Sequence, residues 1–144
     1  MQFWQSPFDR EQSRAWVARS MAAYDSGLGR LAVVMKENGL LVGDCGLMRT
    51  PVNGVSEVDL GYILFRDHWG KGRAIEAARA CLVFALDVLK RRRIVASMET
   101  KHVASRRGAE KIGMTLESEF SNWKNRNVAT LLFAVNGRES HCSA

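Results

Sequence analysis

The feature that most constrains this chain is a strand that runs into a glycine-bearing loop and then directly into a long helix. We expect the strand at Glu57–Phe65, the loop at Arg66–Gly72 and the helix at Arg73–Lys90. The first amides of a helix have no partners within it, and with the helix dipole they favour an anion. Gly70 and Gly72 leave room for a bulky anion, while Lys71 and Arg73 add positive charge. The segment therefore predicts a phosphate or pyrophosphate site.

Three other interpretations of this loop compete with the phosphate or pyrophosphate site. A P-loop needs Gly-Lys followed by Ser or Thr, but Gly72 follows Lys71. A dinucleotide-binding fingerprint needs a third glycine where Ile75 stands, and it opens a βαβ unit rather than following an antiparallel meander. A glycine-bearing turn without any ligand is the third alternative, since Gly-x-Gly alone is a weak signal.

The rest of the chain alternates between strand and helix patterns. Asn38-Gly39 favours a tight hairpin turn, and residues 50–54 predict a second turn. Ser6 to Asp9 predicts a helix start, with Ser6 as the cap, Pro7 at the first position and an acid three residues after the cap. Further strands are expected at Leu31–Met35, Leu40–Met48, Ile94–Met98, Met114–Phe120 and Val128–Val135, and a helix at Val103–Ile112. The order predicts one mixed α/β domain, residues 1–136, with a flexible tail at 137–144.

Composition excludes several classes of protein. The 144 residues are 47% hydrophobic and 25% charged, which is typical of a soluble globular domain. No apolar run approaches the roughly 18 residues of a membrane span, and the N-terminus lacks the pattern of a signal peptide. The three cysteines and three histidines lack metal-ligand spacing, so we expect reduced thiols and no metal site. These features predict a cytoplasmic protein.

A net charge of +6 raises the question of nucleic-acid binding. The densest basic run, residues 90–93, falls where the long helix is expected to end, and cations there favour the negative end of the helix dipole. The alternative is a polynucleotide site. We expect no specific nucleic-acid binding and no membrane partner.

Several separated segments resemble the GNAT acetyltransferase superfamily. Gly61-Tyr62, then residues 69–72 (Trp-Gly-Lys-Gly), then Glu76-Ala77 are similar to its acyl-CoA loop, most of all in the branch of the ribosomal-protein alanine N-acetyltransferases. Residues 41–47 resemble the second strand of the family's meander. Residues 104–107 and 110–114 resemble its second CoA-side helix and the exit from it. The matches occur in the family order between Phe8 and Val135.

This resemblance implies a mostly antiparallel sheet flanked by helices and opened at one parallel junction, where the pantetheine arm of acetyl-CoA lies. It implies that the backbone around six residues holds the pyrophosphate: Trp69, Gly70, Lys71, Gly72, Arg73 and Ala74. Backbone N–H groups near Leu60, Gly61 and Tyr62 would polarise the thioester carbonyl. Ser105 matches a position beside the pantetheine or the sulfur, and His102, three residues earlier, is also expected to bind the cofactor. The implied reaction is direct acetyl transfer to a primary amine, on a small molecule or a peptide, within a ternary complex. The alternative is a non-catalytic acyl-CoA-binding module.

The chain also departs from the family pattern. Asp67 stands where Gln or Arg is common, and His102 replaces an Asn. Ala109 occupies the place of a Tyr that protonates the leaving thiolate in many members. The family's usual first strand has no counterpart before the first helix, which would leave a sheet edge exposed. A second copy of the chain could cover that edge, so a homodimer is one possible partner.

Titratable residues near the loop are the candidate proton acceptors. An amine must be neutral to attack a thioester, so a base is useful. Glu57 and Asp59 alternate along one strand and share a face, where either could serve or both could be solvated. His68 has a suitable intrinsic pKa but could also be an ordinary surface residue. Cys45, between small residues, is better interpreted as a packing residue than as a nucleophile.

Overall fold

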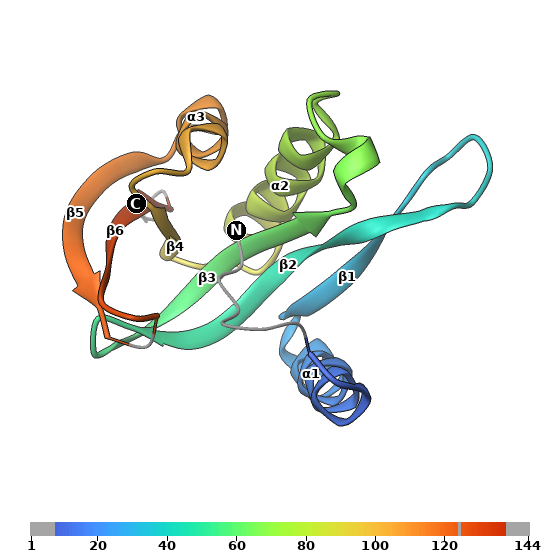
Figure 1. Ribbon diagram of the computed structural model, residues 1–144, viewed down its shortest axis with the longest axis horizontal. Helices are drawn as coiled ribbons and strands as arrows, with labels where there is room; N and C mark the ends of the chain where they lie inside the picture. Colours follow the sequence, from blue (N-terminus) through green and yellow to red (C-terminus); the bar gives the residue numbers. More distant parts are fainter. Residues whose placement is uncertain (1–7, 124, 138–144) are drawn as a thin grey trace, which may run out of the picture.

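The computed structural model describes residues 8–123 and 125–137. It contains one six-stranded sheet in the order β1-β2-β3-β4-β6-β5 (Figure 1). The strands are β1 (Gly29–Val34), β2 (Leu41–Val52), β3 (Val55–Leu64), β4 (Arg93–Glu99), β5 (Thr115–Asn122) and β6 (Val128–Asn136). The α-helices are α1 (Arg10–Ala23), α2 (Arg73–Val83) and α3 (Val103–Lys111), with short helical turns η1 (Tyr24–Ser26), η2 (Arg66–His68) and η3 (Phe84–Val88). The expected mixed, mostly antiparallel α/β fold is confirmed.

A tight turn sets the register of β2 and β3, whereas β1 and β2 are joined by the longer connection at residues 35–40 instead of the tight turn expected at Asn38-Gly39. Asn53 and Gly54 both have positive φ, 48° and 80°, as the two central residues of a tight hairpin turn require. Pairing therefore continues to Val52↔Val55, and β2 extends beyond the residues expected from the sequence. The predicted turn at residues 50–54 shrinks to its last two residues.

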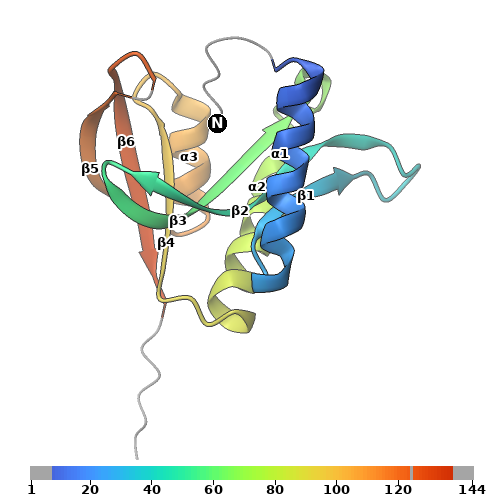
Figure 2. The ribbon, with the colours of Figure 1, turned by 90° about the horizontal axis from the view of Figure 1, so that it is seen from below.

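The two faces of the sheet are covered differently. Helices α2 and α3 lie on one face and α1 on the other (Figures 1 and 2). The α2/α3 face carries the main core, formed by alternate residues of the central strands. Its most buried members include Leu60, Ala78, Ala85, Ile94 and Phe133. A smaller cluster, with Val95, Leu132 and Ala134, lies on the opposite face. No helix of the described residues is both long and apolar enough to span a membrane.

Strands β3 and β4 form the only parallel pair of the described sheet, and they diverge (Figure 2). Their pairing is reduced to Asp59↔Val95. By contrast, β2 and β3 pair continuously from Gly43↔Leu64 to Val52↔Val55. The sheet is thus opened at this junction.

Three further local expectations were wrong. Helix α1 is capped by Asp9, whose side chain accepts from Gln12 N–H while Gln12 Oε1 accepts from Asp9 N–H. Asp9, which was expected inside the helix, is therefore its N-cap residue. The expected cap Ser6 and the expected first helical residue Pro7 lie outside the described residues. Helix α2 ends at Val83 and continues as the π-type turn η3 instead of reaching Lys90. Arg93 begins β4, so the basic run crosses from a helix end into a strand.

Strand β1 forms one edge of the sheet in the described part of the chain. Leu31 and Val34 on this edge are about half exposed. A homodimer formed over this edge stays a prediction.

Candidate active site

The loop before α2 has the geometry of an anion site. Gly72 is the N-cap residue of α2 and makes no side-chain cap, so the first amides of the helix have no side-chain acceptor. Gly70 and Gly72 have φ of 73° and 75°, a region that favours glycine. A Cβ at either position would meet nothing within 4 Å, so the backbone is open to a bulky ligand. The residues here fit a pyrophosphate.

Side chains of η2 and its neighbours hold this loop against β3. Trp69 Nε1 donates to the Leu64 carbonyl at 2.8 Å, and the Arg66 guanidinium lies 5.6 Å from the Trp69 ring centroid. His68 Nδ1 contacts the guanidinium of Arg73. The structure thus places His68 within the loop, outside the lining of both cavities described below.

We call the hollow between β3, β4, α2 and α3 the donor-side cavity. It is narrow, about 20 Å³, and is lined mostly by apolar residues. The members used below are Leu60, Tyr62, Ser97, Ser105 and Gly108. A Cβ at Gly108 would lie 3.0 Å from the Tyr62 hydroxyl oxygen, so glycine leaves that hydroxyl space against α3.

Two hydroxyl groups meet in the donor-side cavity. Burial raises the pKa of Tyr62, and a hydrogen bond with Ser105 opposes that rise. Ser105 itself is buried, and its Oγ lies 3.5 Å from His102 Nδ1. Burial lowers the pKa of His102. At neutral pH the Tyr62 phenol therefore keeps its proton.

We call the larger hollow on the other face of the sheet the acceptor-side cavity. Its volume is about 340 Å³. It is bordered by α1, β1, the β2–β3 hairpin and the β5–β6 connection. The lining residues used below are Trp16, Arg19, Arg30, Asp59, Gly61 and Asn125. Leu60 and Ser97 line both cavities, so the two hollows adjoin these residues from opposite faces of the sheet at the opened β3–β4 junction.

Asp59 is the titratable group at this junction. Its Oδ1 is buried and has no hydrogen-bond partner among the described residues. Burial raises the pKa of Asp59 to about 7, although the Arg30 charge and the Ser97 backbone lower it. A carboxyl with this pKa is half ionised at neutral pH, and it can both accept and return a proton.

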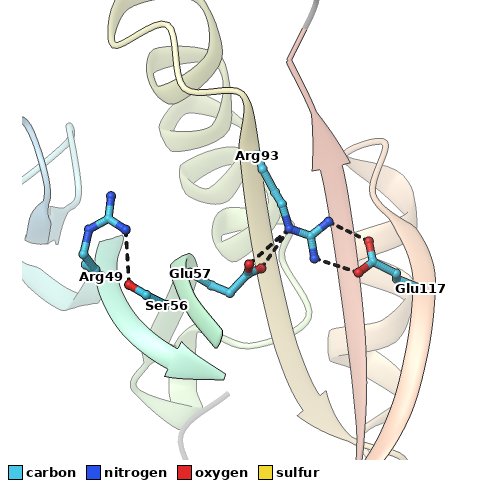
Figure 3. Close-up of polar contacts among 5 residues, drawn as sticks. All are labelled: Arg49, Ser56, Glu57, Arg93 and Glu117. Carbon is cyan, nitrogen blue, oxygen red and sulfur yellow. Dashed lines mark hydrogen bonds and ion pairs between the residues drawn. The ribbon is translucent and has the colours of Figure 1, made fainter. Parts of the chain in front are cut away.

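Glu57 shares the face of Asp59, as expected, but its carboxylate is bound. Arg93 Nε donates to both Glu57 oxygens, at 2.9 and 3.2 Å (Figure 3). The two Nη atoms of Arg93 donate to Glu117 at 2.7 Å each. Glu57 therefore joins β3 to β4 and, through Arg93, to β5, and it lines neither cavity.

Arg30, a buried residue of β1, was not among the site residues predicted from the sequence. Its N–H donates to Ser20 Oγ at 3.2 Å, its carbonyl accepts from the Tyr24 hydroxyl, and its Nε donates to Asp44 Oδ1 at 2.7 Å. The guanidinium also lies 5.4 Å from the Trp16 ring centroid. The available signal was the glycines opposite it: Arg30 pairs with Gly46, which in turn pairs with Gly61.

Cys45 faces the core beneath α2, with its Sγ 3.6 Å from that of Cys81. The contact with Cys81 and burial both raise the pKa of Cys45. The thiol is protonated and enclosed, as a packing residue would be.

Solved structures of other proteins share this architecture. The acetyltransferase from Agrobacterium tumefaciens str. C58 superposes with a TM-score of 0.76 at 26% identity, covering 91% of this chain and 74% of that one. RimL, a ribosomal L7/L12 alpha-N-protein acetyltransferase in complex with coenzyme A, gives a TM-score of 0.75 at 17% identity, with 90% and 74% covered, a likeness of fold. The fold is that of the GNAT acetyltransferases.

Sequence comparison goes one step further. Residues 1–115 match the family model described as the acetyltransferase (GNAT) domain. Uncharacterized protein YkkB of Bacillus subtilis (strain 168) is 33% identical over 124 residues, which are 84% of this chain and 70% of that protein. This chain belongs to the GNAT acetyltransferase family, and the resemblance seen in its motifs is confirmed. Family membership supports acetyl transfer from acetyl-CoA.

Proposed function

We propose that this protein is an N-acetyltransferase that moves the acetyl group of acetyl-CoA directly to a primary amine in a ternary complex. The observation that carries the proposal is that two cavities adjoin Leu60 and Ser97 from opposite faces of the sheet. One cavity is lined by Ile75 in the first turn of α2, the helix that follows the glycine loop, and the other holds a buried carboxyl on the opposite face. Donor and acceptor can therefore reach one point from opposite sides of the sheet.

The donor side binds and orients the thioester. The amides at the start of α2 hold the pyrophosphate, with Lys71 and Arg73 beside it. The wedge between β3 and β4 receives the pantetheine arm, because only one residue pair closes the junction. Backbone N–H groups near Leu60 to Tyr62 polarise the thioester carbonyl. Acetyl-CoA supplies the activated acetyl group.

The acceptor side prepares the amine. Asp59 takes the proton from the amine nitrogen as that nitrogen forms its bond to the carbonyl carbon. Burial gives the carboxyl a pKa of about 7, which suits a base that works near neutral pH. Glu57 is held by Arg93 and His68 lies in the loop, so we assign the base to Asp59.

The leaving thiolate needs a proton when the carbon–sulfur bond breaks. Ala109 cannot supply it, although the family often has a Tyr at that place. Tyr62 reaches the same cavity from β3 and keeps its proton at neutral pH because burial raises its pKa. We assign this proton to the hydroxyl pair of Tyr62 and Ser105.

The test combines calorimetry with turnover. We expect acetyl-CoA and CoA to bind with micromolar affinity and NAD to bind far more weakly, because the site is built for the CoA pyrophosphate and arm. Release of free thiol from acetyl-CoA should then depend on an added amine. Binding without amine-dependent release would favour the acyl-CoA-binding module. Absence of CoA binding would leave the loop as a plain turn and overturn the proposal.

A further inference from the structure

We propose, on the basis of the proposed acetyltransferase function, that the acceptor carries a carboxylate a few ångströms from its amine. The acceptor class is thus an amino acid or a close analogue, and the site for it is the acceptor-side cavity. Three features of this cavity support the proposal: the charges that line it, the position of Arg30 relative to Asp59, and buried polar atoms that form no hydrogen bond.

The charge of the lining disfavours a polycationic acceptor. Two arginines line the cavity, Arg19 from α1 and Arg30 from β1. Asp59 is the one carboxyl group among the described lining residues. A polyamine has several ammonium groups and needs several carboxylates to replace its hydration. Asp44 is ion-paired with Arg30, which leaves Asp59 and Arg19 as the charges without an opposite charge in the described lining, and a molecule with one amine and one carboxylate matches them.

Arg30 and Asp59 are placed at a suitable separation. Arg30, Gly46 and Gly61 occupy one row across β1, β2 and β3. A Cβ at Gly61 would collide with Arg30 Nη1, so the guanidinium lies directly over Gly61. Asp59 is two residues before Gly61 on the same face of β3, which separates the two positions by roughly 7 Å. An amine bound at Asp59 and a carboxylate bound at Arg30 fit within that length.

The guanidinium of Arg30 keeps donors for a ligand. Its Nε donates to Asp44, and Nη2 lies in ion-pair contact with the same carboxylate oxygen. Nη2 is thus paired with Asp44, while Nη1 lies over Gly61 on the side of the cavity. Asp44 therefore orients the guanidinium and takes only part of its donor capacity.

Buried polar atoms that form no hydrogen bond gather in the same cavity. Four buried side-chain polar atoms of the described residues lack a hydrogen-bond partner, and three belong to lining residues. They are Arg30 Nη2, Asp59 Oδ1 and Asn125 Oδ1. A buried polar atom without a hydrogen bond costs free energy, which a ligand that supplies the bond would recover. Asp59 Oδ1 and Asn125 Oδ1 are acceptors suited to an amine, and they lie in the cavity that the Arg30 guanidinium also lines.

The experiment compares matched acceptors that differ only in the carboxylate. Each trio contains an amino acid, its carboxamide and its decarboxylated amine, with glycine, leucine and phenylalanine as parents, and spermidine is tested beside them. We expect the amino acid of at least one trio to exceed its amide in kcat/KM by about tenfold or more, since a charge-assisted pair is lost in the amide. Equal or better use of all amides, or a preference for spermidine, would overturn the inference.

Arginine variants connect the preference to this cavity. Arg19→Gln and Arg30→Lys should raise KM for the amino acid more than for its amide, and so shrink the ratio severalfold. Arg14→Gln is the matched control, because Arg14 is an exposed residue of α1 that does not line the cavity. Thermal melting and acetyl-CoA affinity of each variant report whether the fold and the donor side persist. An unchanged ratio in a folded Arg19→Gln and a folded Arg30→Lys would contradict the assignment.

Binding separates this inference from the proposed function. Calorimetry with the protein saturated by CoA measures affinity for the amino acid and the amide without turnover. Selective binding of the amino acid with no acetylation would overturn the proposed function and uphold the acceptor site. Acetylation of amines with no selectivity for the carboxylate would do the opposite.

Discussion

The two cavities that adjoin the β3–β4 junction are built in contrasting ways. The donor-side cavity is lined by two continuous stretches of the chain, 60–78 and 96–114, and is mostly apolar. The acceptor-side cavity draws on α1, β1, the β2–β3 hairpin, β4 and the β5–β6 connection, and it holds buried charges. Local sequence therefore encodes the donor side, while only the assembled fold creates the acceptor side. Function within this architecture can change on one side without rebuilding the other.

Replacement of Asp59 tests the chemistry of the acceptor side and has the largest expected effect. Asp59→Asn should lower kcat by about 100-fold or more, the range for loss of a general base. The affinity for acetyl-CoA should change less than twofold, because the donor side is untouched. The matched variant is Glu57→Gln, which alters the other carboxyl of the same strand face. Retained activity in Asp59→Asn with loss in Glu57→Gln would reverse our assignment.

The same substitution has a pH signature. The wild-type kcat/KM should rise with pH around a midpoint near 7, because Asp59 must lose its proton to act as a base. The folded-state pKa exceeds the ordinary value of 3.8, so the folded state holds this proton more tightly than the unfolded state. Ionised Asp59 thus lowers stability increasingly from pH 4 to 7. Melting curves should show Asp59→Asn stabilised relative to wild type at pH 8 but not at pH 4.

The ion pair between Glu57 and Arg93 joins β3 and β4 at the closed end of their junction. Both cavities depend on this junction, so removal of the pair tests them together. Arg93→Met would leave the Glu57 carboxylate, whose side chain is 8% exposed, without its cation. The free energy of unfolding in urea should fall by about 3 kcal/mol. Glu117→Gln removes only the exposed partner of Arg93 and should cost less than about 1 kcal/mol. Equal losses would mean that the inner pair does not hold the strands together.

The glycine loop tests the donor side alone. Gly72→Ala forces a side chain into φ of 75° and places a methyl group where the pyrophosphate would lie. The Kd for acetyl-CoA should rise about tenfold, or roughly 1.4 kcal/mol. Gly39→Ala is matched in strain, with φ of 71° and equally open space, but it lies in the β1–β2 hairpin. Similar affinity losses in both variants would indicate strain rather than a lost anion site.

Cys45 is the smallest test, because the proposed transfer does not pass through the enzyme. Cys45→Ala should change kcat less than twofold and lower stability by about 1 kcal/mol through lost packing. Thiol-release kinetics measure the first quantity and urea unfolding the second. A tenfold fall in kcat, with an acetylated Cys45 seen by mass spectrometry in wild type, would demand a covalent intermediate.

Features that depend on local interactions could be predicted from the sequence, whereas features that depend on contacts between distant parts of the chain could not. The strand, loop and helix start of residues 57–73 could be predicted, because a strand pattern, two glycines and a helix start are all local signals. Arg30 was missed because its role depends on Gly46 and Gly61, 16 and 31 residues away in the chain. The pairing of Glu57 with Arg93 was missed for the same reason, and the basic run around Arg93 looked like a helix end. The cap of α1 was misplaced by three residues because Ser6 and Asp9 offer equivalent side-chain acceptors.

The reduced β3–β4 pairing has a consequence for the order of events in a catalytic cycle. In a sheet with continuous strand pairing, the backbone separates ligands that bind on opposite faces. Such ligands could meet only if both entered from the same side. Here each ligand has its own route, and neither route passes through the other. We therefore expect the acetylated product and free CoA to depart independently, with no obligatory sequence, so that CoA is competitive against acetyl-CoA and the acetylated product is competitive against the amine.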